Sequence, residues 1–116
     1  MKRYEIMRAR FEFDYPVKSQ SKLPEYTTDE IFDEVMRKCY ESDRLASLDN
    51  EIDAREMFAA YRNNTTHAER TWTGWAIIGT CSWIEENEYD EDGEIVQTLS
   101  VLDYDAEPFT QPEDEE

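Results

Sequence analysis

The sequence predicts an α+β fold, a small antiparallel sheet of about three strands with two helices packed on one face. Three observations lead to this prediction. Apolar and charged residues alternate near the N-terminus, two amphipathic segments with helix-start signals follow, and a long apolar segment then runs through an Asp-Gly turn into a second one. The predicted order is strand, helix, helix, strand, strand. We expect a single α+β domain over residues 1–107 and an acidic disordered tail over residues 108–116.

The first strand is predicted over residues 7–13, where apolar and charged side chains alternate. Successive side chains of a strand point to opposite faces. Met7, Ala9, Phe11 and Phe13 are therefore expected in the core, and the charged residues between them are expected to face water or a partner.

Two helices are predicted in the middle of the chain. Thr27 and Glu30 have the spacing of a capping box, and apolar residues then recur at helical intervals, which indicates a helix from 28 to about 41. Asp49-Asn50 can cap a second helix that runs to about Arg62.

The segments on either side of the second helix are predicted as turns. We expect a short helical turn at Leu45 and Leu48 and a polar turn at residues 63–66.

Residues 71–86 form the strongest predicted strand, because they are rich in Trp, Ile and Thr and contain no proline. Both faces of this segment are apolar, which is typical of a central strand. Residues 90–93 read as a hairpin tip, since Asp-Gly supplies the positive φ that tight turns need. The return strand is predicted over residues 95–104.

The register of this hairpin stays open in the sequence. A two-residue loop would place Ile84 opposite Val101, and a four-residue loop would place Ile84 opposite Leu99. The sequence also leaves open whether the first strand borders the hairpin.

Charge is divided unevenly along the chain. The first 70 residues hold all 12 basic and 15 of the 29 acidic residues, whereas the remainder holds 14 acidic residues and no lysine or arginine. A net charge of −17 disfavours direct binding to nucleic acid and to anionic membranes. With no apolar leader and two cysteines expected as free thiols, the chain is predicted to be cytoplasmic.

The acidic residues of the second half are the predicted partner-binding site. Carboxylates recur at every second position from Glu86 to Glu94, so an extended chain would present them on one side. Trp72 is added as an aromatic anchor at a strand entrance, while Trp75 and Trp83 are assigned to the core. The predicted site residues are Glu85, Glu86, Glu88, Asp90, Glu91, Asp92, Glu94, Asp103, Asp105, Glu107 and Trp72.

Catalytic and metal chemistry find little support in the sequence. His67 lies in a polar loop without an evident partner, and the two cysteines lie in apolar patterns. Residues 88–99 match a calcium loop in part, but position 12, which should be a glutamate, is Leu99. We therefore predict no enzymatic activity, no metal and no cofactor; an enzyme based on carboxylates or calcium is the last-ranked hypothesis.

The carboxylates of residues 85–94, 103–107 and 113–116 make the chain resemble the acidic inhibitor proteins of phages and mobile elements. That group includes DNA mimics that block restriction enzymes, CRISPR effectors or DNA-repair enzymes. The resemblance is one of composition and covers less than half of the chain. It implies a non-enzymatic protein that binds and inhibits a basic, nucleic-acid-binding partner.

In a second hypothesis, the acidic residues serve only to keep the protein in solution. In it, the protein is a small structural or regulatory domain whose apolar β-surface mediates homo-oligomerisation, so that a homodimer is expected.

Overall fold

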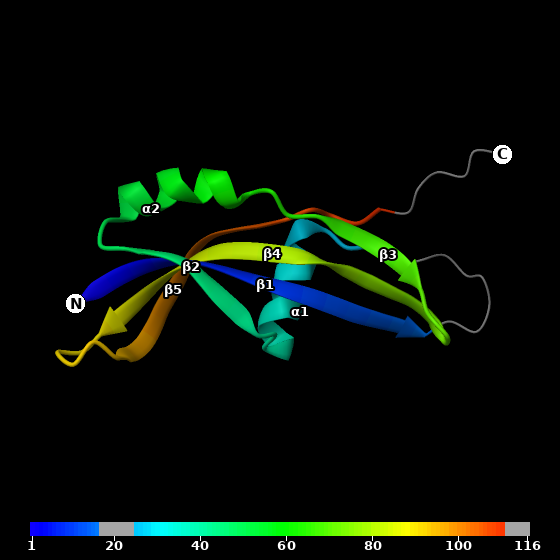
Figure 1. The fold of residues 1–116 in the computed structure, drawn as a ribbon, viewed down its shortest axis with the longest axis horizontal. Coiled ribbons are helices and arrows are strands. Elements are labelled where there is room, and N and C mark those ends of the chain that lie inside the picture. The colour runs from blue at the N-terminus through cyan, green and yellow to red at the C-terminus, as the bar shows by residue number, and fades with distance from the viewer. Residues whose placement is uncertain (17–24, 111–116) are drawn as a thin grey trace.

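The structure is a computed structural model that describes residues 1–16 and 25–110. It is mostly sheet, with 55% strand and 22% helix, and its five antiparallel strands curl into a half-barrel (Figure 1). The predicted α+β fold with three strands is therefore wrong. Two strands were missed, and the two helices do not share a face of the sheet.

The described residues form two α-helices, one 3-10 turn and five strands. They are β1 (Lys2–Pro16), α1 (Thr28–Lys38), β2 (Ser42–Leu48), α2 (Glu51–Phe58), the 3-10 turn η1 (Ala59–Tyr61), β3 (Thr66–Arg70), β4 (Gly74–Tyr89) and β5 (Ile95–Ala106).

The long pairing of β1 with β4 forms the centre of the sheet. It is antiparallel and runs from Lys2 opposite Glu88 to Pro16 opposite Gly74. On its other edge, β1 pairs with β2. The other edge of β4 is shared, because β3 pairs with its first part and β5 with its second part (Figure 1).

The two helices cover opposite faces of the sheet. One hydrophobic cluster joins α1 to odd-numbered residues of β1 and β4, including Phe11, Phe13 and Trp83. A second cluster joins α2 to even-numbered residues, including Ile6 and Ile84. Alternation along each strand separates these two sets, so most of β4 and the part of β1 around Ile6 are buried on both sides, while Arg10, Glu12 and Asp14 of β1 are exposed. The prediction that both helices pack on one face is wrong for this reason.

Both predicted helix starts are confirmed. The side-chain oxygen of Thr27 accepts from the backbone N–H of Glu30, and the Glu30 carboxylate accepts from the backbone N–H of Thr27, which completes the capping box. The Asn50 side chain accepts from the backbone N–H groups of Ile52 and Asp53. Within the described part of the chain, no helix combines the length and apolarity needed to cross a bilayer.

The missed strands are short and partly polar. β2 occupies the segment predicted as a helical turn, and its Leu45 and Leu48 pack against the α2 cluster. β3 begins inside the predicted polar turn at residues 63–66 and pairs with the first part of β4. Tertiary pairing with a long neighbouring strand outweighs the weak local preference of both segments.

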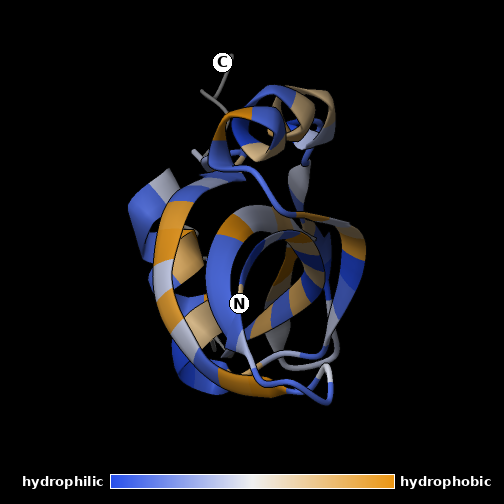
Figure 2. Cartoon of the chain, turned by 90° about the vertical axis from the view of Figure 1, so that its left-hand side faces the viewer, coloured by the Kyte–Doolittle hydropathy of each residue, from blue (hydrophilic) through white to orange (hydrophobic). Residues whose placement is uncertain are grey.

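Three β-bulges determine the register of β5. The extra residues in β5 are Leu102, Leu99 and Val96, and each shifts the pairing by one position. As a result Ile84 lies opposite Asp103, so neither predicted register is correct. Bulges bend a strand and increase its twist, which accounts for the strong curl of the sheet seen end-on in Figure 2.

The segment after β5 remains attached to the core for several residues. Phe109, which lies inside the segment predicted as a tail, is buried among the residues packed against α1. Its backbone exchanges two hydrogen bonds with Tyr26, of 2.8 and 2.9 Å. Residues 111–116, the rest of the predicted tail, lie outside the described residues.

Gly79 of β4 lies between Phe11 of β1 and Thr66 of β3, its partners in the sheet. A Cβ atom at this position would lie 2.2 Å from the carbonyl oxygen of Thr65 and 2.9 Å from the Phe11 ring. We expect Gly79→Ala to lower the free energy of unfolding by about 3 kcal/mol, because the clash is with backbone as well as core. Urea denaturation measures this change.

Gly93 provides the matched control for that substitution. Its φ is +83°, but a Cβ atom would meet nothing within 4 Å. Gly93→Ala should therefore cost only about 1 kcal/mol of backbone strain. Equal losses in the two variants would contradict the close-packing role of Gly79.

Candidate protein-interaction surface

The β4–β5 turn has a defined conformation. The backbone N–H of Asp90 donates to the carbonyl of Glu94 (3.0 Å), and that of Gly93 donates to the carbonyl of Asp90 (3.1 Å). The Asp90 carboxylate accepts from the backbone N–H groups of Asp92 (2.9 Å) and Glu94 (3.0 Å). Gly93 supplies the positive φ of the turn. The carboxylates here are thus carried by a hydrogen-bonded scaffold.

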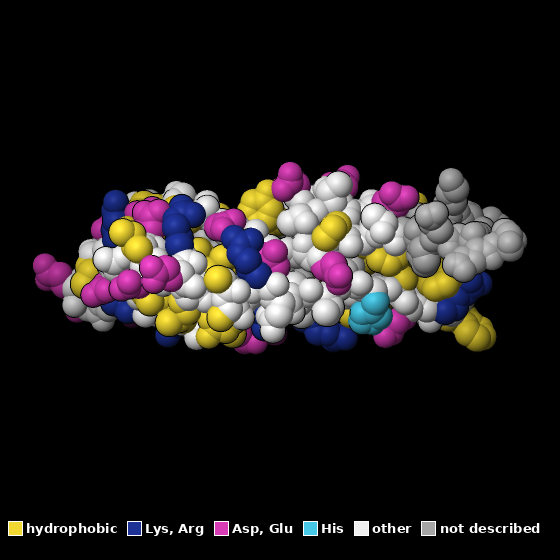
Figure 3. All heavy atoms as spheres, turned by 90° about the horizontal axis from the view of Figure 1, so that it is seen from above, with side chains coloured by type: hydrophobic (Ala, Val, Ile, Leu, Met, Phe, Trp, Pro, Cys, Tyr) yellow, Lys and Arg dark blue, Asp and Glu magenta, His cyan; other side chains and the backbone are white. Residues whose placement is uncertain are grey.

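Four carboxylates at this turn form the acidic tip, which consists of Asp90, Glu91, Asp92 and Glu94. All four residues are exposed. Of the ion pairs formed among the described residues, none involves the acidic tip. Acidic side chains are visible at the hairpin end of the molecule in Figure 3. The regular spacing expected from Glu86 onwards ends at this turn, because the chain reverses there.

The carboxylates that precede the tip are neutralised within the fold. Because β1 borders β4, Lys2 lies 3.2 Å from the Glu86 carboxylate and the N-terminal ammonium of Met1 lies 3.3 Å from that of Glu88. This answers the question left open by the sequence, since the basic first strand does border the acidic hairpin. Such exposed pairs contribute little stability, but they cancel charge locally.

The carboxylates at the end of β5 are also engaged. Arg62 forms ion pairs with Asp103 and with Asp105, the latter at 3.7 Å. Asp105 further accepts from the Asn64 side chain at 2.7 Å. These contacts attach the loop before β3 to β5.

Glu107, which is exposed, and Glu85, which is half-buried, both accept hydrogen bonds from other residues of the chain. The Glu107 carboxylate accepts from the backbone N–H of Thr66 (3.1 Å). Glu85 accepts from the indole N–H of Trp83 (2.8 Å) and from the Asn87 amide (3.0 Å). Glu85 therefore belongs to a polar cluster on the α1 side of the sheet, away from the face that carries Glu86.

Glu5 is the centre of this polar cluster, and the sequence analysis did not identify it. The residue is only 1% exposed, and its carboxylate accepts from the Tyr89 hydroxyl (2.6 Å), the Asn87 amide (2.7 Å) and Arg44 (2.9 Å). Burial alone would raise the pKa of Glu5, but these hydrogen bonds outweigh it and hold the pKa below its usual value. The only sequence signal was its odd-numbered position, in phase with the core face.

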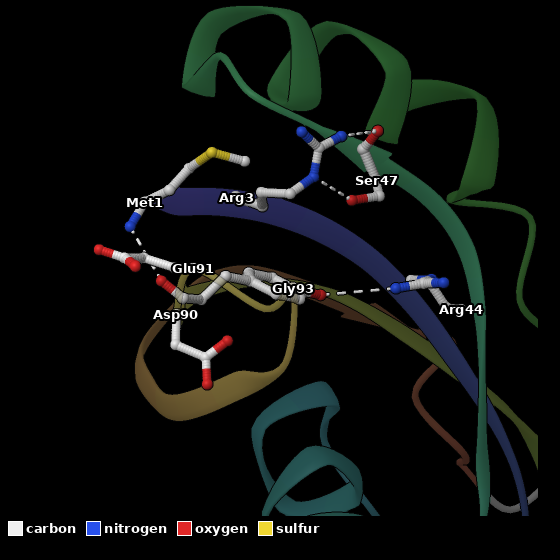
Figure 4. A pocket seen from close by; sticks show the side chains of 8 residues that line it. Met1, Arg3, Arg44, Ser47, Asp90, Glu91 and Gly93 are labelled. Carbon is white, nitrogen blue, oxygen red and sulfur yellow. Dashed lines mark hydrogen bonds between the residues drawn. The ribbon is translucent and has the colours of Figure 1, made fainter.

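A hollow of about 820 Å³ opens beside this cluster, between the start of β1, β2 and the hairpin turn (Figure 4). Arg3 and Arg44 line it, but both guanidinium groups already have partners. Arg3 donates to the side chain and carbonyl of Ser47, and Arg44 donates to Glu5. The arginines thus support the walls of the hollow.

Trp72 lies at the opposite end of the molecule from the acidic tip. It occupies the turn between β3 and β4, and its side chain is 99% exposed. Sixteen residues of β4 separate the two turns, which corresponds to roughly 50 Å at the rise of a β-strand. The structure therefore does not bring Trp72 together with the predicted acidic residues.

Exposed aliphatic residues of β5 lie immediately after the acidic tip instead. We call this set the β5 strip; it consists of Ile95, Val96, Leu99 and Val101. These residues were predicted as part of the return strand, without an interaction role. The sequence signal for an interaction role was the high apolar content of this segment. The structure adds that β5 pairs with β4 alone among the described strands.

The structure places the histidine and the two cysteines in different surroundings. His67 is exposed and contacts Glu69 at 3.0 Å. Cys81 is buried, which raises the pKa of its thiol to about 12, while Cys39 is exposed at the end of α1. Over residues 1–16 and 25–110, no group of three or more His, Cys, Asp or Glu side chains has a metal-binding arrangement.

Comparison with known proteins identifies no relative. No protein-family description, no curated protein and no solved structure matches this chain. The residues and their geometry are therefore the basis for any functional proposal.

The buried Glu5 carboxylate should stabilise the fold in a pH-dependent way. Its pKa is lower in the folded than in the unfolded chain. This stabilisation is therefore complete above the unfolded-state pKa, near 4.5, and is lost as pH falls through the folded-state value. We expect Glu5→Gln to lower the free energy of unfolding by about 2 kcal/mol at neutral pH.

Urea denaturation across pH tests this prediction. The difference between wild type and Glu5→Gln should narrow on acidification below about pH 4. Glu12→Gln, an exposed change on the same strand, should leave stability unchanged at neutral pH. A difference that stays constant with pH would contradict the role given to the Glu5 charge.

Proposed function

We propose that the protein binds a basic, nucleic-acid-binding partner protein through the hairpin end of the molecule and inhibits it by occupying its basic surface. The observation that carries the proposal is the acidic tip. It presents four exposed carboxylates without ion-pair partners among the described residues, on a turn held by backbone hydrogen bonds. In this proposal the protein has no catalytic role and binds no nucleic acid itself.

The distribution of ion pairs along the hairpin supports this proposal. Lys2, the N-terminus and Arg62 neutralise carboxylates on the flanks of the hairpin, whereas the tip keeps its full charge. The acidic tip presents a cluster of negative charges. A basic groove on a partner would meet the same sign of charge there as along a short stretch of phosphates. The proposed mimicry is therefore concentrated at the tip and does not extend along the whole hairpin.

The net charge of −17 would speed the encounter with a basic partner. Electrostatic steering raises the association rate and weakens as salt screens the charges. We propose that the protein acts in the cytoplasm, in keeping with its two free cysteines.

Charge reversal at the tip tests the proposal. We expect Glu91→Lys, Asp92→Lys and Glu94→Lys together to reduce the association rate with a captured basic partner by about tenfold or more at low salt. Asp90 is left intact because its carboxylate holds the turn. Partners are captured from bacterial lysate on the immobilised wild-type protein, and their association is then measured by biolayer interferometry over a range of salt.

The matched control makes the same charge change at the other end of the sheet. Glu12→Lys, Asp14→Lys and Glu69→Lys alter exposed positions far from the tip, so binding should fall much less. Inhibition is checked by competition between the protein and nucleic acid for the same partner. Equal binding by both triple variants, or an association rate independent of salt, would refute the proposal.

Homo-oligomerisation remains a second candidate function, because the exposed β5 strip is an apolar surface on a strand with a free edge. Self-association of so acidic a chain should strengthen with added salt, whereas binding to a basic partner should weaken. Multi-angle light scattering at low and high salt distinguishes the two. A monomer under both conditions would exclude this candidate.

A further inference from the structure

The β5 strip lies next to the acidic tip and has an open side. Ile95 is 51%, Val96 59%, Leu99 37% and Val101 38% exposed. β5 pairs only with β4, so its other edge has no neighbour among the described strands. Four exposed aliphatic side chains within seven consecutive residues make this segment a candidate contact surface.

Strand addition to this open edge is disfavoured by the bulges of β5. The bulges at Val96, Leu99 and Leu102 interrupt the regular spacing of hydrogen-bonding groups along the strand. Natural sheets use bulges of this kind to prevent pairing at their edges. An occupant of the β5 strip must therefore make contact mainly through side chains.

The charge beside the β5 strip favours a basic partner over a second copy of the chain as its occupant. The acidic tip precedes the β5 strip directly and forms no ion pair among the described residues, whereas Asp103 and Asp105 beyond the other end are paired with Arg62. A second copy of the chain, with a net charge of −17, would bring further carboxylates toward the acidic tip. A partner with lysine or arginine beside its apolar residues would complement them.

We propose that the β5 strip is the apolar part of the binding surface and that it receives a basic amphipathic helix of the partner protein. The inference rests on the proposed function above. The strip extends over about 20 Å, the length of roughly four helical turns. Leucine-like residues of the helix would cover Val96 and Leu99, while flanking lysine or arginine residues would meet the acidic tip. Trp72 takes no part in this interface.

Two synthetic peptides test the proposal on the intact protein. The first is an amphipathic helical peptide with leucines on one face and lysines on the other, and the second carries serines in place of the leucines. We expect the leucine peptide to bind wild type about tenfold more tightly than the serine peptide. Fluorescence anisotropy of labelled peptides measures both affinities.

Variants then assign this difference to the β5 strip. Ile95→Thr, Val96→Thr and Leu99→Thr together should abolish the preference for the leucine peptide, because threonine retains strand propensity but removes apolar surface. Ile52→Thr, at a residue 68% exposed on α2, and Trp72→Ser should leave the preference unchanged. Circular dichroism confirms that each variant is folded.

The possible outcomes separate the two proposals. If the strip variant keeps the preference for the leucine peptide, or if Trp72→Ser removes this preference, the assignment of the β5 strip is wrong. In that case, loss of binding on charge reversal of the acidic tip would still support the proposed function. If neither peptide binds wild type at low salt, or if tip reversal has no effect on either, both proposals fail. Loss of the preference in the strip variant alone supports the inference.

Discussion

The fold depends on the antiparallel ladder between β1 and β4. Every other element attaches to it, since β2 extends β1, β3 and β5 divide the far edge of β4, and the two helices cover opposite faces. The paired strands come from opposite halves of the chain. Most stabilising contacts are therefore distant in sequence, which is typical of slow-folding β-rich topologies.

The same ladder determines which carboxylates are neutralised within the fold. Antiparallel pairing places the basic start of β1 beside the acidic end of β4, so Lys2 and the N-terminus neutralise Glu86 and Glu88. Other carboxylates, such as Glu5, became structural acceptors. In the described part of the acidic second half, the carboxylates with no ion pair and no hydrogen bond beyond their own turn are those of the acidic tip, which lies next to the β5 strip.

Local patterns predicted both helices and three of the strands, but not β2, β3 or the arrangement of the elements. The alternation around Phe11, the capping box at Thr27 and the Asp-Gly turn each identify an element correctly, because the responsible interactions are local. β2, β3 and the bulged register depend on contacts between distant segments, which no single stretch of sequence encodes. The acidic tip was predicted, whereas the internal ion pairs, the cluster at Glu5 and the separation of Trp72 required the three-dimensional structure.

The length of the central ladder also determines how the molecule moves in solution. Its principal extents are 58 × 24 × 17 Å, and its radius of gyration of 16.8 Å exceeds the roughly 13 Å typical of a compact chain of this size. An elongated particle has greater frictional drag than a sphere of equal mass. The monomer should therefore elute early in gel filtration and tumble anisotropically, with slowest reorientation of the long axis that ends in the acidic tip.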